Sequence, residues 1–207
     1  EYRNLLGRDG ITSLERVHDL GNLELLVLRL PDLVGSPLSV NSLRVDLQLS
    51  HKTVSGWLEI LERLYAIFRL PPFGSPAVRA VKKAAKHYHF DWTLPASPPQ
   101  RFENLTASHL LKWVHHQQDV FGRDLELGYF RDTDGREVDF VVTERRKPIL
   151  LVECKWDDAP IDRSLRYLKA RFPSSEAWQI TAAGSRDYLD PEGIRVCPAV
   201  SFLTRLV

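Results

Sequence analysis

The sequence has little of several residue types that would point to a particular class of protein. It contains no methionine, not even at position 1, so we expect it to begin inside a longer chain or to have been processed. Its two cysteines, Cys154 and Cys197, are too few and too far apart for a disulfide framework or a structural zinc site. Such sparse cysteine usage favours a reducing compartment, and we expect a cytoplasmic location.

Long apolar runs and an excess of one charge are also missing. No stretch approaches 18 consecutive apolar residues, so the sequence predicts no membrane span, and no basic segment leads into an apolar run as in a secretory signal. The formal net charge is +1, which does not indicate a strongly basic nucleic-acid-binding protein, although local basic surfaces can exist. The GxxxxGK[ST] loop is absent, so ATP would act only through a module upstream of this sequence.

Residues 1–92 have the pattern of a helical domain that ends in a two-stranded wing. Ser50 is a candidate helix N-cap, because its hydroxyl can accept a hydrogen bond from the backbone N–H of Thr53. A short helix, a tight turn and a longer capped helix make a helix-turn-helix, and strands directly after it favour a winged variant. The predicted elements are one or two helices over 11–30 (broken near Gly21-Asn22 and ended before Pro31), a helix over 38–48, a helix of about four turns after Ser50, and strands over 65–70 and 86–92.

Residues 93–100, which contain three prolines, are the predicted linker to a second domain at residues 101–207. The predicted order in that domain is α-β-β-β-α-β, typical of an α/β domain with a mixed sheet. Its predicted elements are a helix from Arg101 to about Gln118, strands over Leu125–Arg131, Arg136–Thr143 and Ile149–Lys155, a helix over Arg163–Phe172, strands over Ala177–Thr181 and Ile194–Cys197, and a short helix after Pro198.

Asp139, Glu153 and Lys155 are the residues of this second domain that point to chemistry. If the connection at 144–148 closes a hairpin centred on Arg146, Asp139 lies opposite Glu153, with Cβ atoms roughly 5 Å apart. Glu153 and Lys155 would share one face of their strand. Two opposed carboxylates repel unless a cation lies between them, and such hard oxygen ligands suit Mg²⁺ or Mn²⁺. Lys155 would polarise an attacking water or stabilise developing phosphorane charge.

A structural interpretation of the same three residues is equally consistent with the sequence. Charged groups inside a sheet are costly unless they are paired, so Asp139, Glu153 and Lys155 could form a salt bridge that caps the sheet. The α-β-β-β-α-β order around them favours the catalytic interpretation.

Asp139 followed by Glu153-x-Lys155 on the next strand, inside this order of elements, resembles the PD-(D/E)XK restriction-endonuclease-like superfamily. The resemblance implies a restriction-endonuclease-like fold, and it implies that an acidic residue on the preceding helix joins the metal site. Glu103 is the matching candidate here, although a glutamate in the first turn is also favoured by the helix dipole. Val138 stands where that superfamily has a proline.

A second resemblance covers nearly the whole chain. The segments that carry it are SHKTVSGWL at 50–58, FRLPP at 68–72, KK at 82–83, FENLTAS at 102–108, GREVDF at 135–140 and VECK at 152–155. In this order they look like the C-terminal region of a prokaryotic family of AAA-type ATPases. That resemblance implies a P-loop module upstream, then a winged helix, then a nuclease-like domain of unassigned function.

Three groups of polar residues are candidates for contact with nucleic acid, and each has a simpler interpretation as a solvated surface. The first is the start of the capped helix, where a recognition helix would enter a groove. The second is an acid-free basic stretch, and the third is a basic face of the helix after the candidate site. The residues are His51, Lys52, Thr53 and Ser55 in the first group, Arg79, Lys82, Lys83, Lys86, His87 and His89 in the second, and Arg163, Arg166 and Lys169 in the third.

Two function classes follow from these patterns. The first is a metal-dependent phosphodiesterase in which Asp139 and Glu153 hold Mg²⁺ or Mn²⁺, Lys155 assists the nucleophile and Glu103 completes the site. The second is a non-catalytic module that binds DNA or a protein partner and regulates the upstream ATPase. In either class we expect the partners to be the upstream ATPase module and DNA, and we expect no association with a membrane. The sequence leaves the oligomeric state open.

Overall fold

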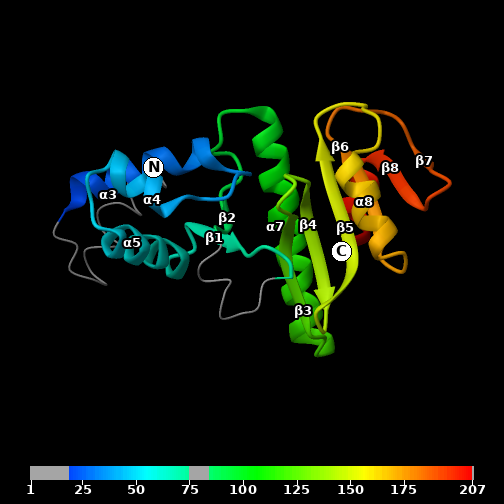
Figure 1. Cartoon of the computed structure of the whole chain (residues 1–207), viewed down its shortest axis with the longest axis horizontal. Helices are drawn as coiled ribbons and strands as arrows, with labels where there is room; N and C mark the ends of the chain where they lie inside the picture. Colours follow the sequence, from blue (N-terminus) through cyan, green and yellow to red (C-terminus); the bar gives the residue numbers. More distant parts are fainter. Residues whose placement is uncertain (1–18, 75–83, 207) are drawn as a thin grey trace.

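The computed structural model describes residues 19–74 and 84–206. It is a mixed α+β structure, with a group of short helices at one end and a six-stranded mixed sheet at the other (Figure 1). A two-stranded sheet and one long helix lie between the two ends (Figure 1). Within the described ranges, no helix is long and apolar enough to cross a membrane.

The helical end is built around one apolar core. Its elements are α3 (Leu20–Arg29), the 3-10 helix η2 (Leu30–Leu33), α4 (Val40–Asp46) and α5 (His51–Arg63). Leu26, Leu43 and Leu58 are buried members of that core. The predicted cap is confirmed, because the Ser50 hydroxyl accepts from the Thr53 backbone N–H at 3.0 Å.

Close to the predicted break at Gly21-Asn22, α3 begins at Leu20 and runs through both residues. The side chain of Asp19 accepts from the backbone N–H of Asn22, which caps the helix just before Gly21 and starts it there. The predicted helical residues before position 19 lie outside the described ranges.

Strand β1 (Ile67–Leu70) pairs antiparallel with β2 (Lys86–His89), as the sequence predicts. The prediction that 86–89 lies on a solvated or phosphate-binding surface is wrong, because Lys86, His87 and His89 are buried. This strand lies between the helical end and the long helix α7 (Pro98–Phe121) (Figure 1). Its basic residues are therefore buried against protein.

Helix α7 begins three residues before the predicted start, inside the stretch that the sequence suggests as a linker. Pro98 and Pro99 occupy its first turn, where a proline costs no hydrogen bond, because those N–H groups have no partner inside a helix. The helix ends at Gly122, which adopts a left-handed conformation with φ of 64°. Phe102, Leu110 and Val114 form its buried stripe.

The six-stranded sheet has the order β3-β4-β5-β6-β8-β7, antiparallel at both edges and parallel in the middle. The predicted α-β-β-β-α-β order is present. The two-residue strand β7 is absent from the prediction because it is too short to show a period. The elements are β3 (Leu125–Arg131), β4 (Glu137–Glu144), β5 (Lys147–Lys155), α8 (Arg163–Arg171), β6 (Glu176–Thr181), β7 (Tyr188–Leu189), β8 (Ile194–Pro198), α9 (Ala199–Leu203) and η3 (Thr204–Leu206).

The β4–β5 hairpin has the predicted register away from its turn, with Phe140 opposite Val152. Its turn is tighter than predicted. Arg145 and Arg146 both have positive φ, as in a two-residue hairpin turn, and Ile149 is an extra residue on β5 that restores the register.

A second irregularity lies in β4 at Asp139. Between Phe130 and Gly128 of β3, the facing strand β4 carries one residue too many, which is a β-bulge. Strict alternation is therefore interrupted: Val138 and Val141 pack in the apolar cluster beneath α8, while Phe140 packs in the cluster beneath α7. The bulge turns Asp139 out of the regular pattern at the point where the candidate site was predicted.

Candidate functional site

Asp139 and Glu153 lie on neighbouring strands, and each carboxylate accepts a hydrogen bond from a backbone N–H of the other strand. Glu153 Oε2 accepts from the Asp139 N–H at 3.3 Å, and Asp139 Oδ2 accepts from the Cys154 N–H at 3.0 Å. The second oxygen of each carboxylate binds a different lysine. The predicted pair is thus adjacent, but its two carboxylates belong to two separate ion clusters.

The first cluster, here called the Lys86 cluster, consists of Lys86, Glu103, Glu137 and Asp139. The Lys86 ammonium lies 2.7 Å from Glu137 Oε1 and 3.3 Å from both Glu103 Oε1 and Asp139 Oδ1. The Lys86 side chain is 0% exposed. An ammonium without water needs its full set of partners from the protein, and three carboxylates supply them.

Neighbouring aromatic residues hold the Lys86 cluster in place. The Tyr88 hydroxyl donates to Glu103 Oε1 at 2.7 Å, and Lys86 lies 5.5 Å from the centre of the Tyr129 ring, within reach of a cation–π interaction. Lys86 and Tyr88 are both fully buried on β2, and Glu103 lies one turn into α7. The cluster therefore joins the two-stranded sheet, the long helix and the bulged strand β4.

The charges of this cluster are strongly coupled. Burial alone would lower the pKa of Lys86, but Asp139, Glu103 and Glu137 more than offset it and keep the pKa above its ordinary range. Burial raises the pKa of Glu103 to about 7, and repulsion from Asp139 adds to that effect, while Lys86 and Tyr88 act in the opposite direction. Lys86 is therefore a permanent cation inside an acidic site.

The second cluster, here called the Lys155 cluster, consists of Lys155, Glu153 and Asp162. Lys155 donates to Glu153 Oε1 and to Asp162 Oδ2, each at 2.8 Å. Asp162 is also the N-cap of α8, because its other oxygen accepts from the Ser164 N–H. The Lys155 side chain is 29% exposed, so this cluster meets solvent, unlike the first.

The electrostatics of the Lys155 cluster follow from the same contacts. Burial raises the pKa of Glu153 well above its ordinary value, and Asp139 adds to the rise, while Lys155 opposes it. Burial alone would raise the pKa of Asp162, but the hydrogen bonds from Lys155 and Ser164 lower it. Burial would lower the pKa of Lys155, but Glu153 and Asp162 reverse that effect and raise it.

The side chain of Gln179 positions Asp162. Gln179 is fully buried on β6, and its Oε1 accepts from the Asp162 N–H at 2.8 Å. Its amide nitrogen donates to the carbonyls of Ala159 and Pro160, so the connection between β5 and α8 is held to the sheet.

This arrangement does not fit the predicted Mg²⁺ or Mn²⁺ ion. Glu103 and Asp139 share the Lys86 ammonium, and Glu153 binds Lys155, so each carboxylate predicted as a metal ligand already has a cation. Among residues 19–74 and 84–206, no group of three or more His, Cys, Asp or Glu side chains is placed to hold a metal ion. A divalent cation would have to displace a buried ammonium from the oxygens that it needs.

Of the residues predicted to contact nucleic acid, some are exposed, some are already paired and some lie outside the described ranges. His51 and Lys52 are exposed at the start of α5, but the Thr53 hydroxyl is engaged with Ser50 Oγ at 2.8 Å. Arg163 is exposed on α8, whereas Arg166 is paired with Asp190 and Glu192 at 2.8 and 2.7 Å. Lys82 and Lys83, together with Arg79, lie outside the described ranges.

Sequence reasoning missed three members of the two clusters, Lys86, Glu137 and Asp162, and it also missed Gln179, which positions Asp162. Glu137 and Asp162 had a weak signal, since Glu137 stands two residues before Asp139 and Asp162 directly precedes a predicted helix. Lys86 and Gln179 had none that is specific, because a lysine among basic neighbours and a glutamine in a strand are usually exposed.

Two family models match the chain. Residues 1–97 match "Domain of unknown function (DUF8612)", and residues 100–202 match "Domain of unknown function (DUF4143)". DUF4143 is a domain that sits C-terminal to AAA ATPase domains. No curated protein and no solved structure matches this chain.

Proposed function

We propose that this chain is the C-terminal region of an AAA-type ATPase and that it serves as a non-catalytic docking and regulatory module for the ATPase. The match of residues 100–202 to a domain found after AAA ATPase domains supports the link to that class of protein. Within this proposal, the helical end with its β1–β2 pair is the winged-helix-like part, and α7 with the six-stranded sheet is the restriction-endonuclease-like part.

The observation that carries the non-catalytic assignment is the position of the Lys86 ammonium. It lies within 3.3 Å of three carboxylate oxygens that converge from α7 and β4, and it is shielded from water. A nuclease of the predicted type needs two of those carboxylates, Glu103 and Asp139, for a divalent cation. Since a lysine with a raised pKa stays charged near neutral pH, the acidic site carries its own cation.

The same lysine ties the two ends of the molecule together. Lys86 belongs to β2, which pairs with β1, the strand that follows α5. Its partners belong to α7 and to β4 of the six-stranded sheet. A rigid connection of this kind suits a module in which a movement of one part is passed on to the other. The connection would be lost if Lys86 left its carboxylate partners.

The first test compares Mn²⁺ binding to the chain and to its Lys86→Met variant. Met has a similar length and no charge, so it frees the three carboxylates and keeps most of the packing. We expect isothermal titration to show no site-specific binding to the unchanged chain, and we expect Mn²⁺ to raise the melting temperature of Lys86→Met selectively. Lys52→Met, at an exposed lysine on α5, is the matched control and should behave like the unchanged chain.

A metal-dependent phosphodiesterase is the second candidate, favoured by the adjacency of Asp139 and Glu153 on β4 and β5. It makes the opposite prediction. The unchanged chain would bind Mn²⁺ and cut DNA, and Asp139→Ala or Lys155→Ala would abolish cleavage. That result would overturn the non-catalytic assignment, whereas absence of cleavage by the unchanged chain together with Mn²⁺ binding only by Lys86→Met would support it.

Contact with DNA is a separate part of the proposal and would use the exposed first turn of α5. His51 and Lys52 are the available groups there. We expect any DNA affinity to be modest, to fall steeply with added salt and to weaken in Lys52→Ala, because phosphate contacts dominate such binding. If the DNA affinity of Lys52→Ala equals that of the unchanged chain, the first turn of α5 does not contact DNA.

A further inference from the structure

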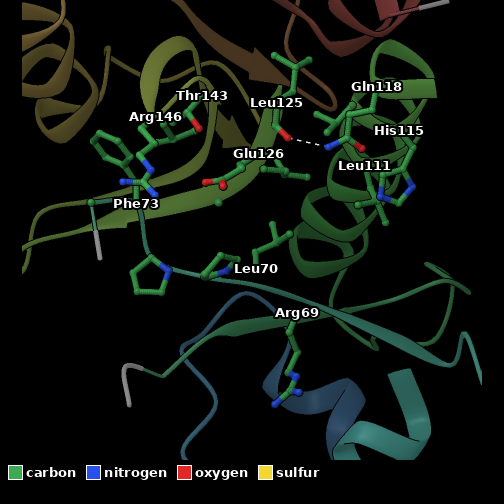
Figure 2. A pocket seen from close by; sticks show the side chains of 17 residues that line it. Arg69, Leu70, Phe73, Leu111, His115, Gln118, Leu125, Glu126, Thr143 and Arg146 are labelled. Carbon is green, nitrogen blue, oxygen red and sulfur yellow. Dashed lines mark hydrogen bonds between the residues drawn. The ribbon is translucent and has the colours of Figure 1, made fainter. Parts of the chain in front are cut away.

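A groove of about 700 Å³ runs along the free edge of the six-stranded sheet, where that edge meets the segment after β1 (Figure 2). Leu125 and Leu127 of β3 line it together with Glu126 and Gly128. Successive residues of a strand point to opposite faces of the sheet, so only a groove that follows the edge of β3 can contact all four.

One end of this edge is already joined by another segment of the chain, through one isolated β-bridge. The Phe73 N–H donates to the Tyr129 carbonyl at 2.6 Å, and the Tyr129 N–H donates to the Pro71 carbonyl at 3.1 Å. A bridge between Pro72 and Tyr129 runs parallel to β3. A Cβ on Gly128 would lie 2.6 Å from the Pro71 carbonyl oxygen, so the glycine permits this close approach.

Two residues earlier, the same edge is open. Backbone groups along an edge strand alternate between the neighbouring strand and the outside, so the outward pair at Tyr129 places the N–H and C=O of Leu127 outward as well. Within the described part of the chain, no backbone hydrogen bond outside the sheet engages Leu127. Among residues 19–74 and 84–206, the Leu127 donor and acceptor in this groove therefore have no partner.

The two walls of the groove differ in chemistry. Leu111 and Val114 of α7 form an apolar wall on the side of Leu127, as Figure 2 shows for Leu111. On the other side lie Thr143 and Arg146 (Figure 2). The Thr143 hydroxyl is buried and has no hydrogen-bond partner among the described residues, and a buried polar group in that state is costly.

The mouth of the groove has an available positive charge. Arg146 is exposed at the tip of the β4–β5 turn, and no ion pair joins it to a described residue. Arg69, at the opposite wall, is already paired with Glu62. An acidic side chain entering beside Arg146 would therefore find a partner that the protein leaves open.

We propose that this groove binds an extended segment of a partner polypeptide, which adds to β3 as a strand beside Leu127 and continues the pairing begun by Pro71 and Phe73. The segment alternates apolar residues, which pack against Leu111 and Val114, with polar residues, one of which hydrogen-bonds Thr143 and an acidic one of which pairs with Arg146. This inference rests on the proposed function, because it names the partner class of the docking module. It follows the general physics of β-strand addition, in which the backbone supplies affinity and alternate side chains supply specificity.

The test uses the full chain and a labelled pool of amide-capped octapeptides that alternate Val, Ile or Leu with Thr, Ser or Glu. Fluorescence anisotropy measures binding, and amide hydrogen exchange by NMR reports on the Leu127 N–H. We expect saturable binding, and we expect exchange at Leu127 to slow by at least tenfold. A matched pool with N-methylated amides at alternate positions, on the side that faces β3, should lose both effects because it cannot donate to the strand.

Two variants on α7 make the position testable without disturbing the core. His115→Trp narrows the groove at an exposed lining residue, whereas His116→Trp makes the same change at an exposed residue outside the lining. We expect His115→Trp to weaken peptide binding at least tenfold and His116→Trp to leave it unchanged. Thr143→Val is a third variant, which removes the hydroxyl without a change in shape and should weaken binding less.

Several results would overturn the proposal. Equal binding of the two peptide pools would show a side-chain pocket rather than strand addition, and absence of binding at millimolar peptide would show that no such segment is accepted. A Leu127 amide already protected in a dimer would show a second copy in the groove. None of these results affects Mn²⁺ binding by Lys86→Met, so the proposal can fail while the proposed function stands.

Discussion

Lys86 and Lys155 make similar ion pairs in very different surroundings. The Lys86 side chain is 0% exposed and binds carboxylates that lie at least 17 residues away along the chain. The Lys155 side chain is 29% exposed and binds carboxylates two and seven residues away. The first cluster therefore depends on the whole fold, whereas the second is nearly local and shares its charge with water.

The difference in burial determines how much stability the protein loses when one partner of an ion pair is removed. A buried ion pair gains little over apolar packing, because burial removes the water that solvates both charges, but the loss of one partner leaves the other charge uncompensated. At a partly exposed pair, water replaces the lost partner. Mutations at the two clusters should therefore differ more than their hydrogen bonds alone would indicate.

Lys86→Met is the change with the largest expected effect. It leaves Glu103, Glu137 and Asp139 without their shared cation, so we expect the free energy of unfolding to fall by about 3–5 kcal/mol. Urea denaturation near neutral pH measures this. Adding Glu137→Gln to the variant should recover part of the loss, and a loss below that of Lys155→Met would contradict the comparison.

His87 sharpens the comparison, because it is buried on the same strand as Lys86 and no described carboxylate contributes to its pKa shift. Burial lowers the pKa of His87 to about 4 from its ordinary 6.5, the neighbouring His89 and Arg69 add to that effect, and the Leu30 carbonyl opposes it. The folded state thus binds the proton more weakly than the unfolded state does. Its contribution is complete above pH 6.5 and is lost as the pH falls towards 4, by roughly 3 kcal/mol in total.

Denaturation of the unchanged chain and of His87→Gln across pH 7 to 4 measures this effect, since glutamine does not titrate. The stability of the variant should fall less steeply over that range. His115→Gln, at an exposed histidine, is the control and should follow the unchanged chain. Glu103 acts in the opposite direction, because its raised pKa of about 7 favours the folded state as the pH falls below 7. A steeper decline in Glu103→Gln would show that contribution.

Lys155→Met should cost less than Lys86→Met. It removes hydrogen bonds to Glu153 and Asp162, but water can reach this cluster, so we expect a loss of about 1–2 kcal/mol. Urea denaturation in parallel with Lys86→Met measures the ratio of the two losses. Equal losses of unfolding free energy would show that the exposure of Lys155 does not reduce the cost of removing its charge.

Arg166→Ala is the smallest of these changes. Arg166 is paired with Asp190 and Glu192 on a surface where its side chain is 37% exposed, so we expect a loss below about 1 kcal/mol that shrinks further with added salt. Thermal melting at low and high salt measures it. A loss above about 1 kcal/mol would show that Arg166 contributes to stability as a buried cation does.

The sequence predicted most of the elements correctly, because each has a local cause. Apolar spacing located α5 and α7, the Ser50 hydroxyl located the start of α5, and Gly135 located the β3–β4 turn with its φ of 81°. The order of strands around the site was also predictable. Strand β7 was missed, because it is too short for any period.

The candidate site was predictable only in part. Asp139 and Glu153 do lie close together on β4 and β5, since the register away from the turn was correct. The bulge at Asp139 was not predictable, because it depends on how β4 meets β3 and not on β4 alone. That bulge directs one carboxylate to the Lys86 cluster and leaves Glu153 with Lys155.

By itself the sequence determined the elements, their order and the set of charged residues at the ends of β4 and β5, because helical and strand periods, caps and turns act over a few residues. Only the tertiary structure decided which cation those carboxylates meet. In the sequence, Lys86 is one more basic residue in a basic stretch. In the structure, β2 pairs with β1 and packs against α7, and this buries the Lys86 side chain. Charges interact through space and not along the chain, so the partner of Asp139 lies 53 residues away.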